Sequence, residues 1–344
     1  MQERDFAVAA AVIAALDQPA ILVGADDRVL ALNPPAAATL PALRVGVQIA
    51  LALRAPDVLD ALADSRRAGE PRQIHWRERV PVERVFAVRV APLDVAPPGV
   101  VALTFADLTA ERRLEQMRSD FIANASHELR TPLASLLGFI ETLQGPARDD
   151  AAARARFLTI MHEQARRMAR LVDDLLSLSR IEQRLHLRPE APVDLAMVLR
   201  EIAAALAPLA QARGVVVDIR ADPAIVAGDR DELMRVAENL VENALKYGVR
   251  EDDPAPRIEL SAGRADGEAF LIVRDFGPGV AAEHLPRLTE RFYRVDAGKS
   301  RAQGGTGLGL ALVKHIIARH GGRLAIDSHP GQGATFRVTI PARP

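Results

Sequence analysis

The chain has 344 residues, enough for two or three domains, and its hydrophobic fraction of 49% is ample for buried cores. It carries 44 basic and 45 acidic residues, so no nucleic-acid partner and no anionic membrane surface is expected. The chain contains no cysteine, which excludes a disulfide framework, a thiolate metal site, a catalytic thiol and a cysteinyl–flavin light sensor.

The first apolar run, residues 6–16, is closed by Asp5 and Asp17 and is too short to span a bilayer. No basic segment precedes it. We therefore expect a cytoplasmic protein as the chain is numbered, and a membrane-associated one if membrane helices precede residue 1.

Residues 1–108 mix short β-rich runs with turns. Ala20–Val23 and Val29–Leu32 flank Gly-Ala-Asp-Asp-Arg and predict a hairpin, and residues 85–90 and 100–105 predict two more strands. This order, with Asn33 after the second strand, resembles a PAS domain. The resemblance implies an α+β sensor domain whose candidate partner is a small ligand or an accessory regulatory protein.

A plain α+β domain is the alternative for the same residues. His75 and Trp76 could face a ligand, but for both side chains we expect core or surface positions.

Residues 109–185 predict two long helices joined near residues 145–150. In the first, apolar residues step by 4, 3, 4 and 3, which makes a helical seam at Leu129, Leu133, Leu136, Ile140 and Leu143. His127 lies two residues before this seam begins, so it points roughly opposite the seam, into solvent. An exposed histidine beside Glu128 is a nucleophile that a partner protein can reach.

An ordinary surface histidine is the alternative for His127. Two features argue against it. Pro132 lies inside the helical pattern, where proline costs about 3 kcal/mol or bends the helix. The apolar residues also step by 4, 4 and 4 from Phe121 to Leu133, a local departure from the heptad. Strain beside an exposed histidine indicates a moving part.

The second helix has its own seam with steps of 4, 3, 4, 3, 4 and 3, at Phe157, Met161, Gln164, Met168, Leu171, Leu175 and Leu178. One such hairpin cannot close a core, whereas two make a four-helix bundle, so we infer a homodimer. The alternative is a hairpin that packs on other domains of its own chain. The arginines at 166, 167 and 170 are expected to form a solvated helix face.

Residues 192–344 alternate helices and strands without a regular βαβ rhythm. Strands are predicted at 215–219, 257–261, 269–274, 322–328 and 335–340. Helices are predicted at 229–247 and 308–320. These elements fit a mixed sheet with helices on one face, an α/β sandwich.

The predicted helix 229–247 carries a polar stripe. Its members, spaced at i, i+4, i+7 and i+8 and therefore on one face, are Asn239, Asn243, Lys246 and Tyr247. The Asn243 amide, with Glu242 beside it, supplies oxygen ligands that suit Mg²⁺. Lys246 suits a phosphate. Taken alone, the stripe could also be a solvated face.

Two glycine-rich segments follow the stripe. Asp275-Phe-Gly277-Pro-Gly279 comes directly after a strand, where the carboxylate can accept a hydrogen bond from a base amino group. The second segment opens a helix, whose free backbone N–H groups can hold phosphate; it includes Gly305, Gly307, Leu308 and Gly309. Neither a P-loop nor a dinucleotide fingerprint is present.

Together these segments resemble the sensor histidine kinases. His127-Glu-Leu-Arg-Thr131-Pro resembles the H-box, and the segments around Asn243, Asp275 and Gly307 resemble the N, G1 and G2 boxes. Glu290-Arg-Phe-Tyr-Arg resembles the F box. The residues around His127 and the PAS-like front most resemble phosphate-regulon sensor kinases.

The resemblance implies ATP and Mg²⁺ as ligands. It also implies autophosphorylation of His127 assisted by Glu128, and transfer to an aspartate of a response regulator. Thr131 is expected to serve dephosphorylation of that regulator. Residues 277–305 are expected to form a mobile lid from which Arg301 reaches the phosphates.

Two alternatives belong to other classes of protein. One is a dimeric scaffold that binds nucleotide without transferring phosphate, against which the full set of His127, Asn243 and Asp275 argues. The other is an ATPase of the gyrase and Hsp90 superfamily, against which the helical hairpin argues.

Overall fold

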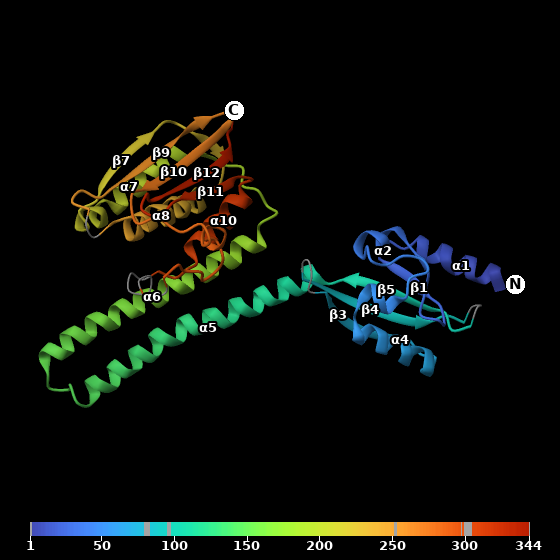
Figure 1. The fold of residues 1–344 in the computed structure, drawn as a ribbon. Helices are drawn as coiled ribbons and strands as arrows, with labels where there is room; N and C mark the ends of the chain where they lie inside the picture. The colour runs from blue at the N-terminus through green and yellow to red at the C-terminus, as the bar shows by residue number, and fades with distance from the viewer. Residues whose placement is uncertain are drawn as a thin grey trace. The chain divides into compact units, whose positions relative to one another are not determined.

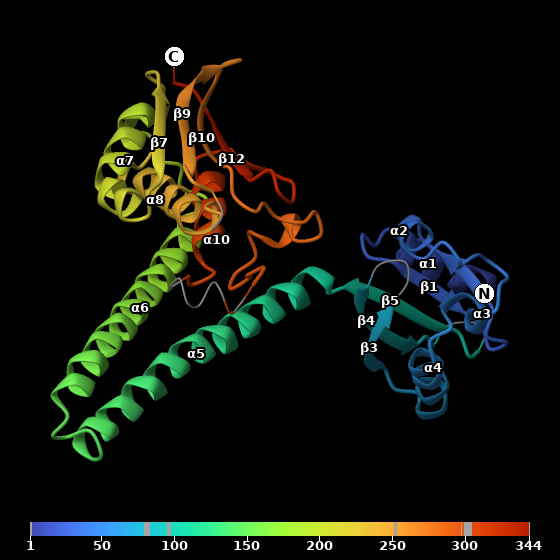
Figure 2. The same cartoon turned by 60° about the vertical axis from the view of Figure 1, so that its left-hand side comes forward.

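The computed structural model describes residues 2–78, 83–94, 98–250, 253–296, 298 and 305–343. The chain forms two compact units, Met1–Asp120 and Phe121–Pro344, each of which is described by itself. Figure 1 and Figure 2 show the elements of both units.

The first unit is built on a five-stranded antiparallel sheet in the order β2-β1-β5-β4-β3. Its strands are β1 Ala20–Val23, β2 Val29–Leu32, β3 Arg72–Glu78, β4 Arg84–Pro92 and β5 Val101–Asp107. Its helices are α1 Gln2–Ala14, α2 Pro34–Thr39, α3 Ile49–Leu53 and α4 Pro56–Ala68. The predicted hairpin and the two later predicted strands are confirmed.

Trp76 and Asn33 are both buried in the interior of this unit. The Trp76 ring stacks on Phe86 with centroids 5.4 Å apart and is only 8% exposed, whereas His75 is exposed. The Asn33 amide nitrogen donates to the carbonyls of Ile13, Leu16 and Gln18. Its amide oxygen accepts from the backbone N–H groups of Ala20 and Ala36. Asn33 therefore ties the end of α1 to β1 and α2.

The helical hairpin consists of α5 Thr109–Gln144 and α6 Ala151–Gln183. The Asp150 side chain caps α6 by accepting from the Ala153 N–H at 2.9 Å. Phe139 of α5 meets Phe157 of α6 with ring centroids 5.1 Å apart. Helix α5 continues through Pro132, so the expected cost of proline does not end the helix.

The two seams of the hairpin are covered differently within one chain. Leu133 and Ile140 of α5 are 47% and 37% exposed. In contrast, Leu171 and Leu178 of α6 are buried in the hydrophobic core of the C-terminal domain. The alternative to a bundle was a hairpin that packs on another domain of its own chain. That alternative therefore holds for the C-terminal part of α6.

The C-terminal domain contains a mixed sheet in the order β11-β12-β10-β9-β7, in which only the β7–β9 pair is parallel. Its strands are β7 Val216–Ala221, β9 Arg257–Ala265, β10 Glu268–Asp275, β11 Arg323–Ser328 and β12 Ala334–Pro341. Helices α7 Leu195–Ala212, α8 Arg230–Tyr247 and α10 Gly309–Arg319 cover one face (Figure 1). The predicted mixed sheet is confirmed.

Three further elements complete this domain, and the sequence did not predict them or helix α7. They are the small sheet of β6 Pro192–Asp194 and β8 Ile225–Ala227, and the 3-10 turn η1 Leu285–Arg287. Helix α7 is long and apolar enough to cross a membrane by length and composition alone. Here its apolar face packs into the domain core, with Leu199 and Ile202 buried.

Candidate functional site

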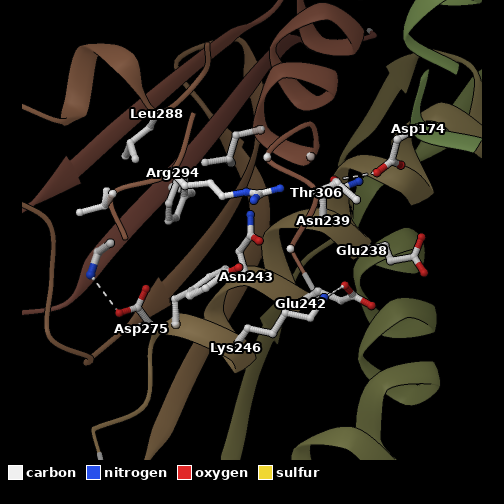
Figure 3. A pocket seen from close by; sticks show the side chains of 18 of the residues that line it. Asp174, Glu238, Asn239, Glu242, Asn243, Lys246, Asp275, Leu288, Arg294 and Thr306 are labelled. Atoms are coloured by element: carbon white, nitrogen blue, oxygen red, sulfur yellow. Dashed lines mark hydrogen bonds and ion pairs between the residues drawn. The ribbon is translucent and has the colours of Figure 1, made fainter. Parts of the chain in front are cut away.

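A cavity of about 1120 Å³ opens between α8, the segment after β10, the glycine turn before α10 and helix α6 of the hairpin. Most of the predicted ligand residues line it, namely Asn239, Asn243, Lys246, Tyr247, Asp275, Gly279, Gly305, Gly307 and Gly309. Figure 3 shows that segments far apart in the sequence converge on this cavity. Gly277 and Leu308 are not among its lining residues.

Helix α8 forms one wall of the cavity. The Asp229 side chain caps the helix by accepting from the N–H groups of Asp231 and Glu232. Further along, the Lys246 ammonium pairs with the Glu242 carboxylate one turn earlier. The predicted stripe therefore lines a cavity, with Tyr247 at its end still 38% exposed. Lys246 is held by a neighbour on the same helix.

Asp275 lies at the end of β10 and is nearly fully buried. Its Oδ1 accepts from the N–H groups of Gly277 at 3.0 Å and Ala334 at 3.1 Å. Burial raises the pKa of the Asp275 carboxyl, while these two backbone hydrogen bonds act in the opposite direction. Gly277 thus orients the Asp275 carboxylate through its backbone N–H.

The glycine turn is shaped by close approach of its neighbours. A Cβ at Gly309 would lie 2.3 Å from Asn239 Oδ1, and one at Gly307 would lie 2.9 Å from the Phe292 backbone. Gly307 has a φ of 74° and accepts from the Phe292 N–H at 2.8 Å. A side chain at Gly309 would displace the Asn239 amide, and one at Gly307 would strain the backbone and meet the backbone of Phe292.

The three hairpin residues predicted to take part in chemistry lie near one another on α5. His127 and Thr131 are exposed. The Thr131 hydroxyl donates to the His127 carbonyl at 3.2 Å. Glu128 is mostly buried, because its carboxylate meets two arginines from other segments.

Those two arginines were not predicted as site residues. Arg294 Nη2 lies 2.9 Å and Arg167 Nη2 lies 3.2 Å from Glu128 Oε2. The expected solvated face is therefore wrong for Arg167, whose side chain is 15% exposed because it pairs with Glu128. Arg294 also lines the cavity, so it connects the H-box to the predicted nucleotide site.

Part of the predicted lid lies outside the described residues. Arg301, Gly304 and residues 299–300 fall there. In the described part, Phe292 packs against Phe121 of α5 with ring centroids 5.9 Å apart. Arg291 lies over the same Phe121 ring and pairs with Glu182 of α6. Through Arg291 and Phe292, the described part of the predicted lid is therefore in contact with both hairpin helices.

The oxygen-rich lining fits Mg²⁺ better than it fits a metal held entirely by protein. Within the described ranges no group of three or more His, Cys, Asp or Glu side chains could hold a metal ion. The wall does offer the Asn243 amide and the Glu238 and Glu242 carboxylates. Mg²⁺ favours such oxygen ligands and usually shares them with water and phosphate oxygens.

Two domain families match the chain. Residues 117–184 match the His Kinase A (phospho-acceptor) domain. Residues 228–344 match the family described as histidine kinase-, DNA gyrase B- and HSP90-like ATPase. The two matches fall on the helical hairpin and on the domain that carries most of the cavity.

Curated relatives agree with these families. The chain is 43% identical over 231 residues to the phosphate regulon sensor protein PhoR of Pseudomonas aeruginosa, covering 67% of this chain and 51% of the relative. It is 36% identical over 260 residues to the signal transduction histidine-protein kinase BaeS of Escherichia coli, covering 74% and 54%. The chain thus spans about half the length of these relatives.

Solved structures share the architecture. The Acinetobacter baumannii histidine kinase AdeS is similar with a TM-score of 0.50 and 25% identity, covering 63% of this chain and 98% of that one. The histidine kinase ThkA, solved in complex with the response regulator protein TrrA, gives a TM-score of 0.51 at 19% identity. That match covers 97% of this chain and 98% of the other, and at this identity it supports the fold alone.

Proposed function

The chain belongs to the sensor histidine kinase family, and from that premise we propose that it phosphorylates itself on His127 with ATP. We further propose that the phosphoryl group passes to an aspartate of a response regulator. The observation that carries the proposal is the Arg294–Glu128 ion pair, because it joins the cavity to the helix turn that bears His127. Incubation with γ-labelled ATP should give a phosphoprotein that is labile in acid and stable in alkali.

We assign the cavity to ATP. The buried Asp275 carboxylate is suited to accept a hydrogen bond from the adenine amino group. Lys246 supplies positive charge for the phosphates, and the N–H groups at the start of α10 are suited to the same anion. Of the predicted contacts, Gly277 and Leu308 would act by shaping the wall, since neither lines the cavity.

Asn243 would hold Mg²⁺ through its amide oxygen. Glu238 and Glu242 lie nearby on the same wall. A bound Mg²⁺ would neutralise charge on the phosphate oxygens. The protein's own part is alignment: α8 fixes the ammonium of Lys246, and the glycine turn fixes the phosphate chain.

In the proposed transfer a ring nitrogen of His127 forms a bond to the γ-phosphorus. The bond from that phosphorus to the β–γ bridging oxygen breaks, and ADP leaves. Glu128 accepts the ring proton of His127. Because Arg294 and Arg167 hold the Glu128 carboxylate, the transfer requires Glu128 to exchange at least one of these partners.

We propose that the protein is also a phosphatase of its phosphorylated regulator, through Thr131. Thr131 follows His127 by one helical turn, so its hydroxyl can orient a water molecule towards a phospho-aspartate docked at that face. The hydroxyl now donates to the His127 carbonyl. A change of side-chain rotamer would free it for this role.

We propose that two copies of the hairpin associate as a four-helix bundle. Support comes from apolar side chains that one chain leaves uncovered along both helices, including Leu133, Leu137 and Leu176. Their burial would stabilise a dimer at about 25 cal/mol per Å² of apolar surface.

For the whole chain we propose three domains, at 1–108, 109–185 and 192–344. The first would be a PAS-like sensor domain, supported by its five-stranded antiparallel sheet flanked by short helices. Its strand hairpin and Asn33 are the features that carried this resemblance in the sequence.

A further inference from the structure

Asp174 of α6 is the point at which the hairpin meets two parts of the cavity wall. Its Oδ1 lies 2.9 Å from Arg235 Nη2 of α8, and its Oδ2 accepts from the Thr306 hydroxyl at 2.9 Å. Figure 3 shows Asp174 reaching from α6 towards Thr306. The carboxylate is largely buried, with 18% of its side chain exposed.

The first arm from Asp174 runs to the start of α10. The Thr306 hydroxyl donates its proton to Asp174, so its lone pairs remain for the Leu308 N–H, which lies 3.3 Å away. Thr306 sits between Gly305 and Gly307, and all three line the cavity. The orientation of this hydroxyl, and with it the shape of the glycine turn, therefore depends on Asp174.

The second arm runs through α8 and returns to the same turn. The Arg235 guanidinium neutralises Asp174 and also binds the Ser177 hydroxyl. The Arg235 carbonyl accepts from the Asn239 amide at 2.8 Å. Asn239 packs so closely on Gly309 that a Cβ there would lie 2.3 Å from Asn239 Oδ1. Both arms therefore end on the glycine turn.

We infer that Asp174 is a positioning residue through which the helical hairpin sets the phosphate-binding glycine turn, so that nucleotide affinity depends on docking of the hairpin. This inference rests on the proposed function, because it needs the turn to hold nucleotide phosphates. Asp174 itself lines the cavity, and in this role it acts through Thr306 and Arg235. Coupling of this kind is reciprocal, so nucleotide must in turn hold α6 against the C-terminal domain.

Binding of the non-hydrolysable analogue AMPPNP to the full chain tests the first half of the inference. Thr306→Val and Asp174→Ala should each weaken binding by roughly tenfold, the loss expected for one hydrogen bond to a charged group. Thr306→Ser, which keeps the hydroxyl, should bind within about twofold of wild type. Glu163→Ala, which removes an exposed carboxylate from the same helix, is the matched control and should bind as wild type.

The double variant Asp174→Ala with Thr306→Val distinguishes coupling from two unrelated losses. If the two side chains act through one hydrogen bond, the double variant binds about as weakly as the weaker single variant. Fully additive losses, or wild-type affinity in either single variant, would overturn the inference.

Hydrogen exchange tests the reciprocal half with a signal that a loss of folding alone would not produce. Amides of α6 near Leu171 and Leu178 should become more protected when AMPPNP is added to wild type, and this gain should vanish in Thr306→Val. An equal gain in both proteins would refute the coupling. Failure of wild type to bind AMPPNP would overturn the proposed nucleotide site itself, whereas normal wild-type binding with unaffected variants would overturn only the role of Asp174.

Discussion

The α8 wall and the H-box turn of α5 hold their functional side chains in opposite ways. On α8, Asn239 and Lys246 are each fixed by a partner four residues earlier, Arg235 and Glu242. On α5, Glu128 is fixed by Arg167 and Arg294, which lie 39 and 166 residues away in the sequence. The nucleotide wall is therefore a local property of one helix, whereas the setting of the phospho-acceptor depends on how separate elements are docked.

The difference indicates a division of labour. A wall built from contacts within one helix keeps its shape when domains move, whereas the glycine turn opposite it depends on α6 through the Thr306–Asp174 hydrogen bond. Glu128 is held by arginines on other elements, so its surroundings change whenever those elements move. Substitutions on the wall should therefore damage chemistry directly, and substitutions on the H-box turn should separate one reaction from another.

The largest effect is expected from Asn243→Asp. The change replaces a neutral amide with a carboxylate at the proposed metal ligand and alters both charge and geometry. Phosphorylation of His127 should fall by about a hundredfold or more, a loss typical of removing a group that stabilises charge in the transition state. The initial rate with γ-labelled ATP measures this, and a normal rate would contradict the place given to Asn243.

Asp275, at the end of β10, offers a pH test of the assigned nucleotide site. Because burial raises the pKa of its carboxyl, protonation begins at a higher pH than for an ordinary aspartate. The protonated group is a poorer acceptor for the adenine amino group, so ATP affinity should fall as the pH is lowered towards that range. In Asp275→Asn the affinity should be about tenfold lower near pH 7, and this acid-dependent loss should be absent.

The raised pKa of the Asp275 carboxyl also affects the free energy of unfolding. An acid with a folded-state pKa above its unfolded value binds more protons when folded, so stability falls as the pH rises through this window. Asp275→Asn should therefore remove a destabilising contribution at neutral pH. A pH dependence of binding identical in both proteins would sink the assignment of Asp275 to adenine.

A smaller effect is expected at the N-terminus of α8, where His320 contacts the capping residue Asp229. Its Nε2 accepts from the Asp229 N–H at 3.0 Å and its Nδ1 donates to the Ile316 carbonyl at 2.8 Å, an arrangement that requires a neutral ring. Burial lowers the pKa of His320 below 6.5. The unfolded chain therefore binds more protons just below that value, and stability is lost as the pH falls through the window.

We expect the free energy of unfolding of wild type to drop between pH 7.5 and 5.5 by about 1 kcal/mol more than that of His320→Gln. Comparing the two proteins separates His320 from His315, whose pKa burial also lowers. Denaturant unfolding at the two pH values provides the measurement. Equal drops in both proteins would show that His320 does not carry the dependence.

The smallest effect on phosphorylation is expected from Thr131→Ala. Removing the hydroxyl takes away one hydrogen bond to a helix carbonyl and leaves His127 in place, so autophosphorylation should stay within about twofold. Dephosphorylation of a purified phospho-regulator in the presence of ADP should slow by roughly tenfold or more, the typical contribution of a positioned polar group. Equal dephosphorylation by both proteins would remove Thr131 from this role.

The same contrast explains what the sequence could and could not predict. The strands β9, β10 and β12 and the polar face of α8 follow from residue periodicity, which is a local signal. Helix α7 was missed because its alanine-rich sequence is apolar at most positions and contains an internal Pro208, both of which weaken the helical signal. Most cavity residues could be predicted because each short motif, such as the polar stripe of α8, lies within a single element.

Contacts between remote elements lay beyond sequence reasoning. Arg167 looked like one of three surface arginines, and nothing local indicated that it pairs with Glu128 on the other helix. Asp174 likewise sits among the charged residues of α6, and only the folded chain brings it to Thr306. Pairings across such separations are set by how the hairpin helices and the C-terminal domain pack, for which one sequence carries no periodic signal.

The most direct test of the account uses wild type and His127→Gln side by side. Each protein is incubated with γ-labelled ATP, and AMPPNP binding is measured on the same preparations. We predict acid-labile label in wild type, none in His127→Gln, and AMPPNP affinities within about threefold of each other, because His127 is exposed and does not line the cavity. Label that persists in His127→Gln, or that survives acid in wild type, would contradict the central claim that the H-box histidine accepts the phosphoryl group.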